Sequence, residues 1–206
     1  MNDNPLLLLV TASAGLYVAW QWLGDLRAAR AGRPNPHAWP GATPAPGQAF
    51  ALAAFGGVAL TLAETWGESR LGLAAQQSQM TALFAAYTML VAPFVEELIF
   101  RGFIVIDRRG AAARWAGAVG ASLVFAALHP FLWEWKKGEP WHLTLTAKGW
   151  FSTGAVFTGS LWFYTMRLAA RLNPHGSLLP CFSAHGAKNL AVVAVKAAQG
   201  FLVGWW

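Results

Sequence analysis

The chain has little charge, a single cysteine and no internal repeat. Only 12% of its 206 residues are Asp, Glu, Lys or Arg, whereas 56% are hydrophobic, and this balance excludes an ordinary soluble domain. Its one cysteine, Cys181, excludes an intramolecular disulfide. The sequence pI of about 10.0 comes from basic residues at the ends of apolar segments, without a basic stripe or a binding motif. We therefore expect no nucleic-acid partner.

Long apolar segments make up most of the sequence. About 20 apolar residues are enough to cross a hydrocarbon core of about 30 Å as a helix, and six segments of roughly this length occur. The sequence therefore predicts an all-α fold: a polytopic membrane helical bundle of about six transmembrane helices, with the lipid bilayer as a partner. It forms a single integral membrane domain, residues 1–206. The expected spans are 5–23, 48–66, 80–106, 112–133, 149–169 and 178–204.

The loops between these spans differ in charge. Arginines gather after the first, third and fifth spans, so the positive-inside rule makes these loops cytoplasmic and places both termini outside. The first span is expected to be retained, because no basic region precedes it. The segment 33–47 holds too many prolines to be helical. It lies between two N-terminal helices, within residues 1–79, that precede a four-helix catalytic core at 80–204. The arginines are Arg27, Arg30, Arg33, Arg108, Arg109, Arg114, Arg167 and Arg171.

Two adjacent glutamates lie in the third span. A charged side chain in hydrocarbon is costly, so its presence there indicates a functional site. Glu97 and Arg101 are four residues apart, so on a helix their side chains are neighbours and can form an ion pair. Glu96 points about 100° away from that pair, which suits it to face a cavity as a general base. Pro93, three residues earlier, is expected to kink or loosen the helix.

Two further spans carry one polar face each. Phe125 and His129 are one helical turn apart, as are His185 and Asn189, so each pair shares a face of its helix. Counted from the cytoplasmic loops at about 1.5 Å per residue, Glu96, His129 and His185 fall within about 10 Å of one another in depth. This agreement favours one shared site over separate polar contacts that merely join helices.

A carboxylate, two imidazoles and an amide at one depth suit the hydrolysis of an acyl bond. The carboxylate and an imidazole deprotonate a water, and the other donors stabilise the oxyanion. A Zn²⁺ ion bound by Glu96, His129 and His185 is an alternative. The chain has no His-Glu-x-x-His segment, so a mechanism without a metal or another cofactor is favoured. Cys181, one turn before His185, is a weaker candidate nucleophile, since a buried thiol is usually a small hydrophobe.

At these residues the sequence resembles the CPBP family of intramembrane proteases, which are related to the type II CAAX prenyl endopeptidases. This family is also described as the bacteriocin-processing and lysostaphin-resistance group. The resemblance covers about residues 80–200 and rests on three ordered motifs, the first with the family's Glu-Glu-x-x-x-Arg pattern. The motifs are Pro93-Phe-Val-Glu-Glu-Leu-Ile-Phe-Arg-Gly102, Phe125-Ala-Ala-Leu-His129 and His185-Gly-Ala-Lys-Asn189.

The resemblance implies an intramembrane endopeptidase, glutamic-type or metal-dependent, that cuts a membrane-associated protein or peptide. Prenylated proteins, sorting-tagged proteins and bacteriocins are the substrate classes it leaves open. A multi-pass chain of this kind suits a bacterial inner membrane. The implied roles are water activation by Glu96, assistance by His129, oxyanion stabilisation by His185 and Asn189, and support by Glu97, Arg101 and Phe125.

Two other functions reuse the same residue types. A proton-coupled transporter also places carboxylates and imidazoles within a membrane, although the inverted repeats of such proteins are missing. A catalytically inactive scaffold would keep the fold without the reaction. Lys188, directly before Asn189, and Lys196 depart from the family pattern. We expect Lys188 to snorkel, to meet a substrate carboxylate, or to fill the cavity.

Overall fold

Helices make up most of the protein. The computed structural model describes residues 5–106, 109–135 and 138–205; Arg108, one of the expected topology signals, lies outside them. The elements are α1 (Pro5–Arg30), α2 (Gly47–Arg70), the 3₁₀ helix η1 (Ala74–Gln76), α3 (Ala82–Leu90), α4 (Ala92–Glu97), the π-helix η2 (Leu98–Phe103), α5 (Gly110–Leu128), β1 (Trp133–Glu134), β2 (His142–Leu143), α6 (Ala147–Leu168) and α7 (Leu179–Ala198).

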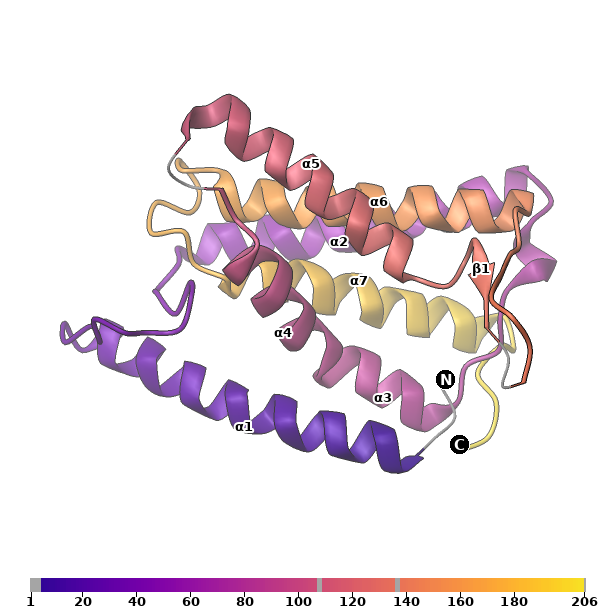
Figure 1. The fold of residues 1–206 in the computed structure, drawn as a ribbon, viewed down its shortest axis with the longest axis horizontal. Helices are drawn as coiled ribbons and strands as arrows, with labels where there is room; N and C mark the ends of the chain where they lie inside the picture. Colours follow the sequence, from indigo (N-terminus) through magenta and orange to yellow (C-terminus); the bar gives the residue numbers. More distant parts are fainter. Residues whose placement is uncertain (1–4, 107–108, 136–137, 206) are drawn as a thin grey trace.

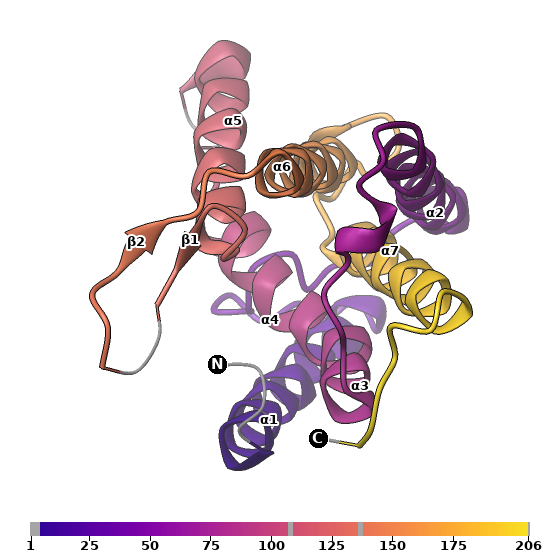
Figure 2. The same cartoon turned by 90° about the vertical axis from the view of Figure 1, so that its right-hand side faces the viewer.

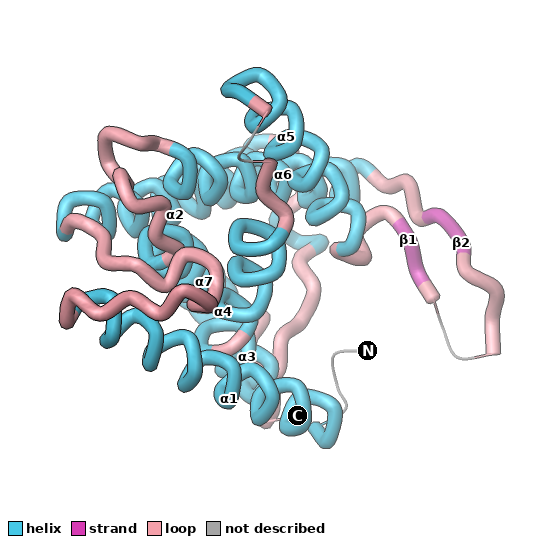
Figure 3. Tube along the Cα trace, turned by 60° about the vertical axis from the view of Figure 1, so that its left-hand side comes forward, coloured by secondary structure: helices cyan, strands magenta, loops and turns pink. Residues whose placement is uncertain are grey.

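The helices form a bundle around α7. Figure 1 shows the long helices running side by side. Seen from one end in Figure 2, α2, α6 and α7 are neighbours, α5 lies beyond α6, and α1 lies beside α3 on the other side. Within the described residues, strand is confined to the antiparallel pair β1–β2, which projects away from the helices in Figure 3.

The predicted all-α membrane bundle is confirmed. Among the described residues, four helical segments are long and apolar enough to cross a membrane: α1, α2, the continuous run from α3 to η2, and α5. The other two expected spans, α6 and α7, form helices of 22 and 20 residues but are less apolar. Their inner faces carry polar groups that the bundle buries, including Ser160 and His185. The bundle shields these polar groups from lipid, and this shielding cannot be read from the composition of α6 and α7 alone.

The third expected span is helical from Ala82 to Phe103, and it consists of three pieces, α3, α4 and η2. Pro93 has no backbone N–H to donate to the preceding turn, and the helix breaks at Val91, between α3 and α4. A π-helical segment, η2, follows directly after Glu97, and its register is visible where Ile104 N donates to Ile99 O at 3.1 Å. Such segments are frequent at functional sites.

Small residues bring α2 and α7 close together. Four residues of α2 that are spaced four apart are small and buried: Ala49, Ala53, Gly57 and Thr61. A Cβ placed on Gly57 would lie 2.3 Å from the carbonyl oxygen of Ala184. The two backbones can therefore approach this closely only because position 57 is glycine, the packing that small residues permit between membrane helices. This contact places α7, with His185, against α2.

Two spans end earlier than the sequence predicted. Helix α5 ends at Leu128, so His129 adopts an extended backbone (φ −79°, ψ 127°) instead of continuing the helix to 133. Helix α7 ends at Ala198 rather than 204. The residues that follow α7 run alongside the start of α3, where Ala82 N donates to Gly204 O at 3.1 Å. This bond satisfies one of the free N–H groups that every helix start leaves.

The proline-rich segment is not helical, as predicted, and packs across one end of the bundle. Trp22 Nε1 donates to Pro40 O at 3.0 Å, and Leu178 N donates to Gly41 O at 3.0 Å. The Trp39 ring meets the Phe103 ring edge-on at 6.1 Å. The segment therefore ties α1, η2 and the start of α7 together at one end of the bundle.

Candidate active site

Four polar residues, Glu96, Glu97, Arg101 and His185, lie together and are called the polar cluster below. Glu97 lies at its centre. Its Oε1 accepts a hydrogen bond from Arg101 Nη1 at 3.0 Å and another from His185 Nδ1 at 2.8 Å. Glu97 and Arg101 are both fully buried, so the predicted ion pair is confirmed. The contact to His185 was not predicted. It joins α4 to α7 and fixes which nitrogen of the imidazole faces the carboxylate.

Arg101 is enclosed by α5 and α6. Its Nη2 donates to the backbone oxygen of Ser160 at 3.1 Å and to the Ser160 hydroxyl, which in turn donates to the Ser122 hydroxyl at 2.9 Å. The guanidinium carbon lies 4.7 Å from the centre of the Phe125 ring and 4.8 Å from that of Tyr164. Hydrogen bonds and aromatic faces together stabilise this buried cation, although its Nε has no hydrogen-bond partner among the described residues.

Glu96 has a different environment from Glu97. About 32% of its side chain is exposed, and its Oε2 lies 3.8 Å from His185 Nε2. This distance is too long for a direct hydrogen bond, and the same oxygen accepts none from the described residues. The two neighbouring carboxylates thus differ. Glu97 is fixed in a buried ion pair, whereas Glu96 is partly exposed and its buried Oε2 faces His185 without a hydrogen bond from the described residues.

Phe125 lies between the two histidines. Its ring centre is 4.8 Å from that of His129 and 6.3 Å from that of His185. His129 Nδ1 is 2.8 Å from the carbonyl oxygen of Phe125, so this nitrogen donates to that oxygen. No hydrogen bond or ion pair joins His129 to Glu96 among the described residues. His129 is therefore linked to His185 only indirectly, because both rings pack against Phe125.

Asn189 lies one turn beyond His185 on α7. Its Nδ2 donates to the carbonyl oxygen of Thr88 at 2.7 Å. Thr88 belongs to the last turn of α3, whose carbonyls lose their regular partners at the break before Pro93. One amide hydrogen of Asn189 therefore stabilises this helix end, and the second remains available. The structure does not join Asn189 to Glu96 or His185 by a hydrogen bond within the described residues.

Comparison with protein families matches residues 78–191 to the family described as type II CAAX prenyl endopeptidase Rce1-like. The match covers more than half of the 206 residues and includes Glu96, His129, His185 and Asn189. The chain belongs to this family. No curated protein and no solved structure matches the chain. The family supports a membrane protease of the CAAX-protease type, whose substrates are associated with the membrane.

The polar residues of this Rce1-like protein do not form a compact set of metal ligands. Within the described part of the chain, no three His, Cys, Asp or Glu side chains converge as a metal ion requires. His185 faces both glutamates, but His129 contacts neither. In this structure Glu96, His129 and His185 therefore do not converge as a set of zinc ligands.

Cys181 is separate from the polar cluster. Its side chain is fully buried, and its Sγ contacts the carbonyl oxygen of Phe163 at 3.3 Å. It packs with Trp22, Leu26 and Leu98 in an apolar core. This is the environment of a small hydrophobic residue rather than of an activated nucleophile.

Lys188 and Lys196, which depart from the family pattern, both have partners away from Glu96. Lys188 Nζ lies 3.0 Å from Glu64 Oε2 on α2. Lys196 Nζ donates to Gln77 Oε1 at 3.1 Å and to Ser78 O at 2.6 Å. Of the outcomes expected for Lys188, filling the cavity beside Glu96 is therefore not what the structure shows. Its ammonium group is held between α7 and α2.

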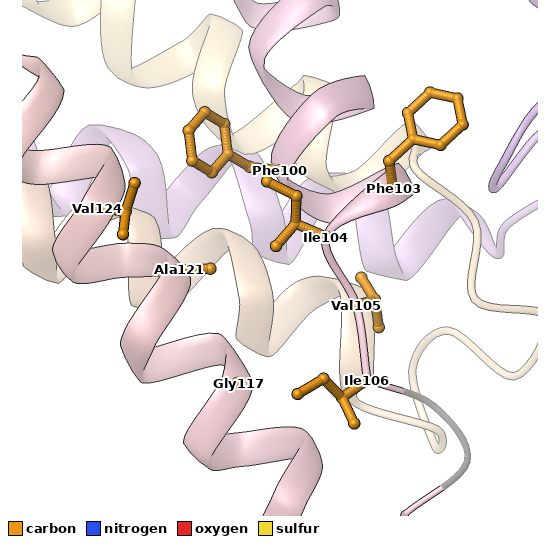
Figure 4. Close-up of a pocket in the computed structure, with 8 residues that line it drawn as sticks. All are labelled: Phe100, Phe103, Ile104, Val105, Ile106, Gly117, Ala121 and Val124. Carbon is orange, nitrogen blue, oxygen red and sulfur yellow. The ribbon is translucent and has the colours of Figure 1, made fainter.

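An apolar hollow lies next to the site. The hollow has a volume of about 380 Å³ and lies between α5 on one side and residues 100–106 on the other. It is lined by Phe100, Phe103, Ile104, Val105, Ile106, Gly117, Ala121 and Val124. Figure 4 shows these side chains, none of which carries a charge. Phe100 is shared with the site, since its ring packs edge-on against Phe125 at 4.9 Å. Glu96 and the two histidines do not line the hollow.

Sequence reasoning missed the contribution of α6. Ser160 and Tyr164 both contact Arg101 and are both buried, yet they lie outside the three motifs. Isolated Ser and Tyr residues in an apolar segment carry no distinctive pattern, because such residues often join membrane helices. Only the fold shows that they face the one buried arginine of the cluster.

Proposed function

We propose that the protein is an intramembrane endopeptidase that hydrolyses a peptide bond of a membrane-associated protein or peptide, with Glu96 as the base that activates water. The single observation that carries the proposal is the approach of Glu96 Oε2 to His185 Nε2 at 3.8 Å, where Oε2 accepts no hydrogen bond from the described residues. Two atoms at this separation can both be within about 2.8 Å of one water oxygen. A water placed there would meet a carboxylate and an imidazole together.

The roles of the other residues follow from their contacts. Glu97 accepts a hydrogen bond from Nδ1 of His185. The other ring nitrogen, Nε2, therefore faces Glu96. Glu96 takes a proton from the water as its oxygen bonds to the carbonyl carbon, and the carbonyl electron pair becomes the oxyanion. Protonated His185 donates from Nε2 to that oxyanion, and the second amide hydrogen of Asn189 provides a further donor.

Collapse of the tetrahedral intermediate breaks the carbon–nitrogen bond, and the proton held by Glu96 passes to the leaving amine. His129, whose ring packs against Phe125, assists the proton transfers. Each step uses only side chains of this chain, so the proposal is a glutamic-type mechanism without a cofactor. A strong chelator applied to the purified protein is then expected to leave cleavage unchanged.

The test compares new protein termini in membranes and medium from cells that express the wild type or Glu96→Gln at equal levels. Termini that disappear with Glu96→Gln support the proposal and identify the substrate. They also decide between prenylated, sorting-tagged and bacteriocin substrates. Identical profiles overturn it. If Glu96→Gln then also rescues a gene deletion, the protein is a scaffold; if it does not, proton-coupled transport in vesicles is tested next.

We further propose that the protein resides in a bacterial inner membrane, with the proline-rich segment on the cytoplasmic side. The arginines of the loops after α1, η2 and α6 support this orientation. Fusion of a reporter that is active only in the cytoplasm to the segment 33–47, and of the same reporter to the β1–β2 hairpin, tests it. The reporter is expected to be active at the first position and inactive at the second.

A further inference from the structure

Helix α6 holds the π-helical segment that follows the two glutamates. Three α6 residues on one face, Ser160, Tyr164 and Arg167, contact this segment. Ser160 binds the guanidinium of Arg101, whereas the other two bind backbone carbonyls. Arg167 Nε donates to Arg101 O at 3.0 Å, and the Tyr164 hydroxyl donates to Phe100 O at 2.6 Å. One face of the C-terminal part of α6 is thus directed at η2.

The Tyr164 hydroxyl replaces a backbone donor that the π-helix removes. In a regular α-helix Phe100 O would accept the N–H of Ile104. In η2, Ile104 N donates to Ile99 O instead, which leaves the carbonyl of Phe100 without that bond. In a membrane interior an unsatisfied carbonyl is costly. The hydroxyl of Tyr164 meets this need at 2.6 Å and also contacts Ile104 O at 3.0 Å.

Tyr164 contacts the site in a second way through its ring. The guanidinium of Arg101 lies 4.8 Å from the ring centre, and the residue is 1% exposed. Arg101 binds Glu97, and Glu97 binds His185. A shift of η2 toward α-helical register would therefore move Arg101 and, through Glu97, the imidazole that faces Glu96.

We propose that Tyr164 is a positioning residue of the active site: its hydroxyl stabilises the π-helical register of η2, and this register places the Arg101–Glu97–His185 chain. This inference rests on the proposed proteolytic function for its kinetic consequence. Its structural consequence, the orientation of His185, is independent of that function. The two can therefore be tested apart.

The variant that isolates the hydroxyl is Tyr164→Phe, because it keeps the ring over Arg101. We expect kcat for the substrate found by the terminus comparison to fall at least about tenfold, while KM stays within about twofold, because substrate binding is not altered. Tyr17→Phe, at an exposed position on α1, is the matched control and is expected to keep wild-type kinetics. Tyr164→4-aminophenylalanine restores a donor and is expected to recover most of kcat.

The second measurement follows His185 directly by nitrogen NMR of histidine-labelled protein in lipid nanodiscs, with its signals assigned by His185→Gln. Tyr164→Phe is expected to shift the ring nitrogens of His185, and Tyr17→Phe is not. Unchanged kcat and unchanged His185 signals overturn the proposal. A loss of kcat that only follows a loss of folded protein, without rescue by 4-aminophenylalanine, also overturns it. If the wild type cleaves nothing, the proteolytic function fails, and the NMR comparison still decides the role of Tyr164.

Discussion

Glu97 Oε1 and His185 Nδ1 lie 2.8 Å apart although the two residues are separated by 88 positions in the sequence. The same oxygen also accepts from Arg101. One buried carboxylate oxygen therefore links the helix that carries the glutamates to the helix that carries His185 and Asn189. It also directs the free edge of the imidazole toward Glu96.

Glu97→Gln is expected to destabilise the protein as well as to abolish cleavage. The amide keeps the size of the side chain but removes the negative charge, so the fully buried Arg101 loses its counter-charge. Loss of one partner from a buried pair costs about 3–5 kcal/mol. Unfolding of the purified variant in detergent, followed by circular dichroism, measures the effect, and the NMR signals of His185 report the lost hydrogen bond.

Glu96→Gln is the matched control for this experiment, because it makes the same chemical change one residue away. Glu96 is partly exposed and its Oε2 accepts no hydrogen bond from the described residues. The free energy of unfolding of Glu96→Gln is therefore expected to stay within about 0.5 kcal/mol of wild type. Cleavage is expected to be lost in both variants. Equal stability of the two variants would contradict the buried ion pair.

Asn189→Ala is expected to lower both stability and rate. The substitution removes the donor to the part-buried Thr88 carbonyl, and loss of a hydrogen bond of this kind costs about 1 kcal/mol. It also removes the amide hydrogen assigned to the oxyanion, and loss of one such donor typically lowers kcat about 10²–10³-fold. Detergent unfolding and cleavage of the identified substrate measure the two effects separately. Wild-type stability would show that the bond to Thr88 is unimportant.

Much of the site was accessible from sequence because its residues follow helical periodicity. The spacing of Glu97 and Arg101 predicts their ion pair, and the structure shows it. The positions of α1, α2, the run from α3 to η2, and α5 were also predictable, since long apolar runs decide them. The different environments of Glu96 and Glu97 followed from the same geometry, because adjacent residues of a helix point in different directions.

What the sequence could not provide are contacts between helices. The hydrogen bond from His185 to Glu97 and the hydroxyl of Tyr164 on η2 depend on how α4, α6 and α7 meet, and no local pattern encodes this. The helix ends were also missed. His129 leaves the helix although the residues around it are apolar, because hydropathy does not distinguish a helix from an extended apolar segment.

Gly57→Ala is expected to destabilise the bundle and reduce cleavage. The added Cβ would lie 2.3 Å from Ala184 O, a backbone atom that can move only with α7. Overpacking of this kind costs about 1–3 kcal/mol, and the forced shift occurs one residue from His185. Gly24→Ala, in α1, is the control, because a Cβ there meets nothing within 4 Å. If both variants unfold alike, the close α2–α7 contact is not required.

Charge exchange between Glu64 and Lys188 tests whether Lys188 is a structural residue. Their side chains are 21% and 11% exposed and lie 3.0 Å apart, so Lys188→Glu places two carboxylates together and Glu64→Lys two ammonium groups. Each single variant is expected to lose stability and activity. The double variant Glu64→Lys with Lys188→Glu is expected to recover a large part of both, with a coupling energy of about 1–3 kcal/mol.

The same cycle separates the two remaining roles of Lys188. A lysine that only joins α7 to α2 can exchange places with its partner, because the ion pair is the same in either orientation. A lysine that binds a substrate carboxylate cannot, since the exchange would present a negative charge from α7. Recovery of stability without recovery of KM would therefore assign Lys188 to substrate binding. Recovery of both would assign it to the packing of α7 against α2.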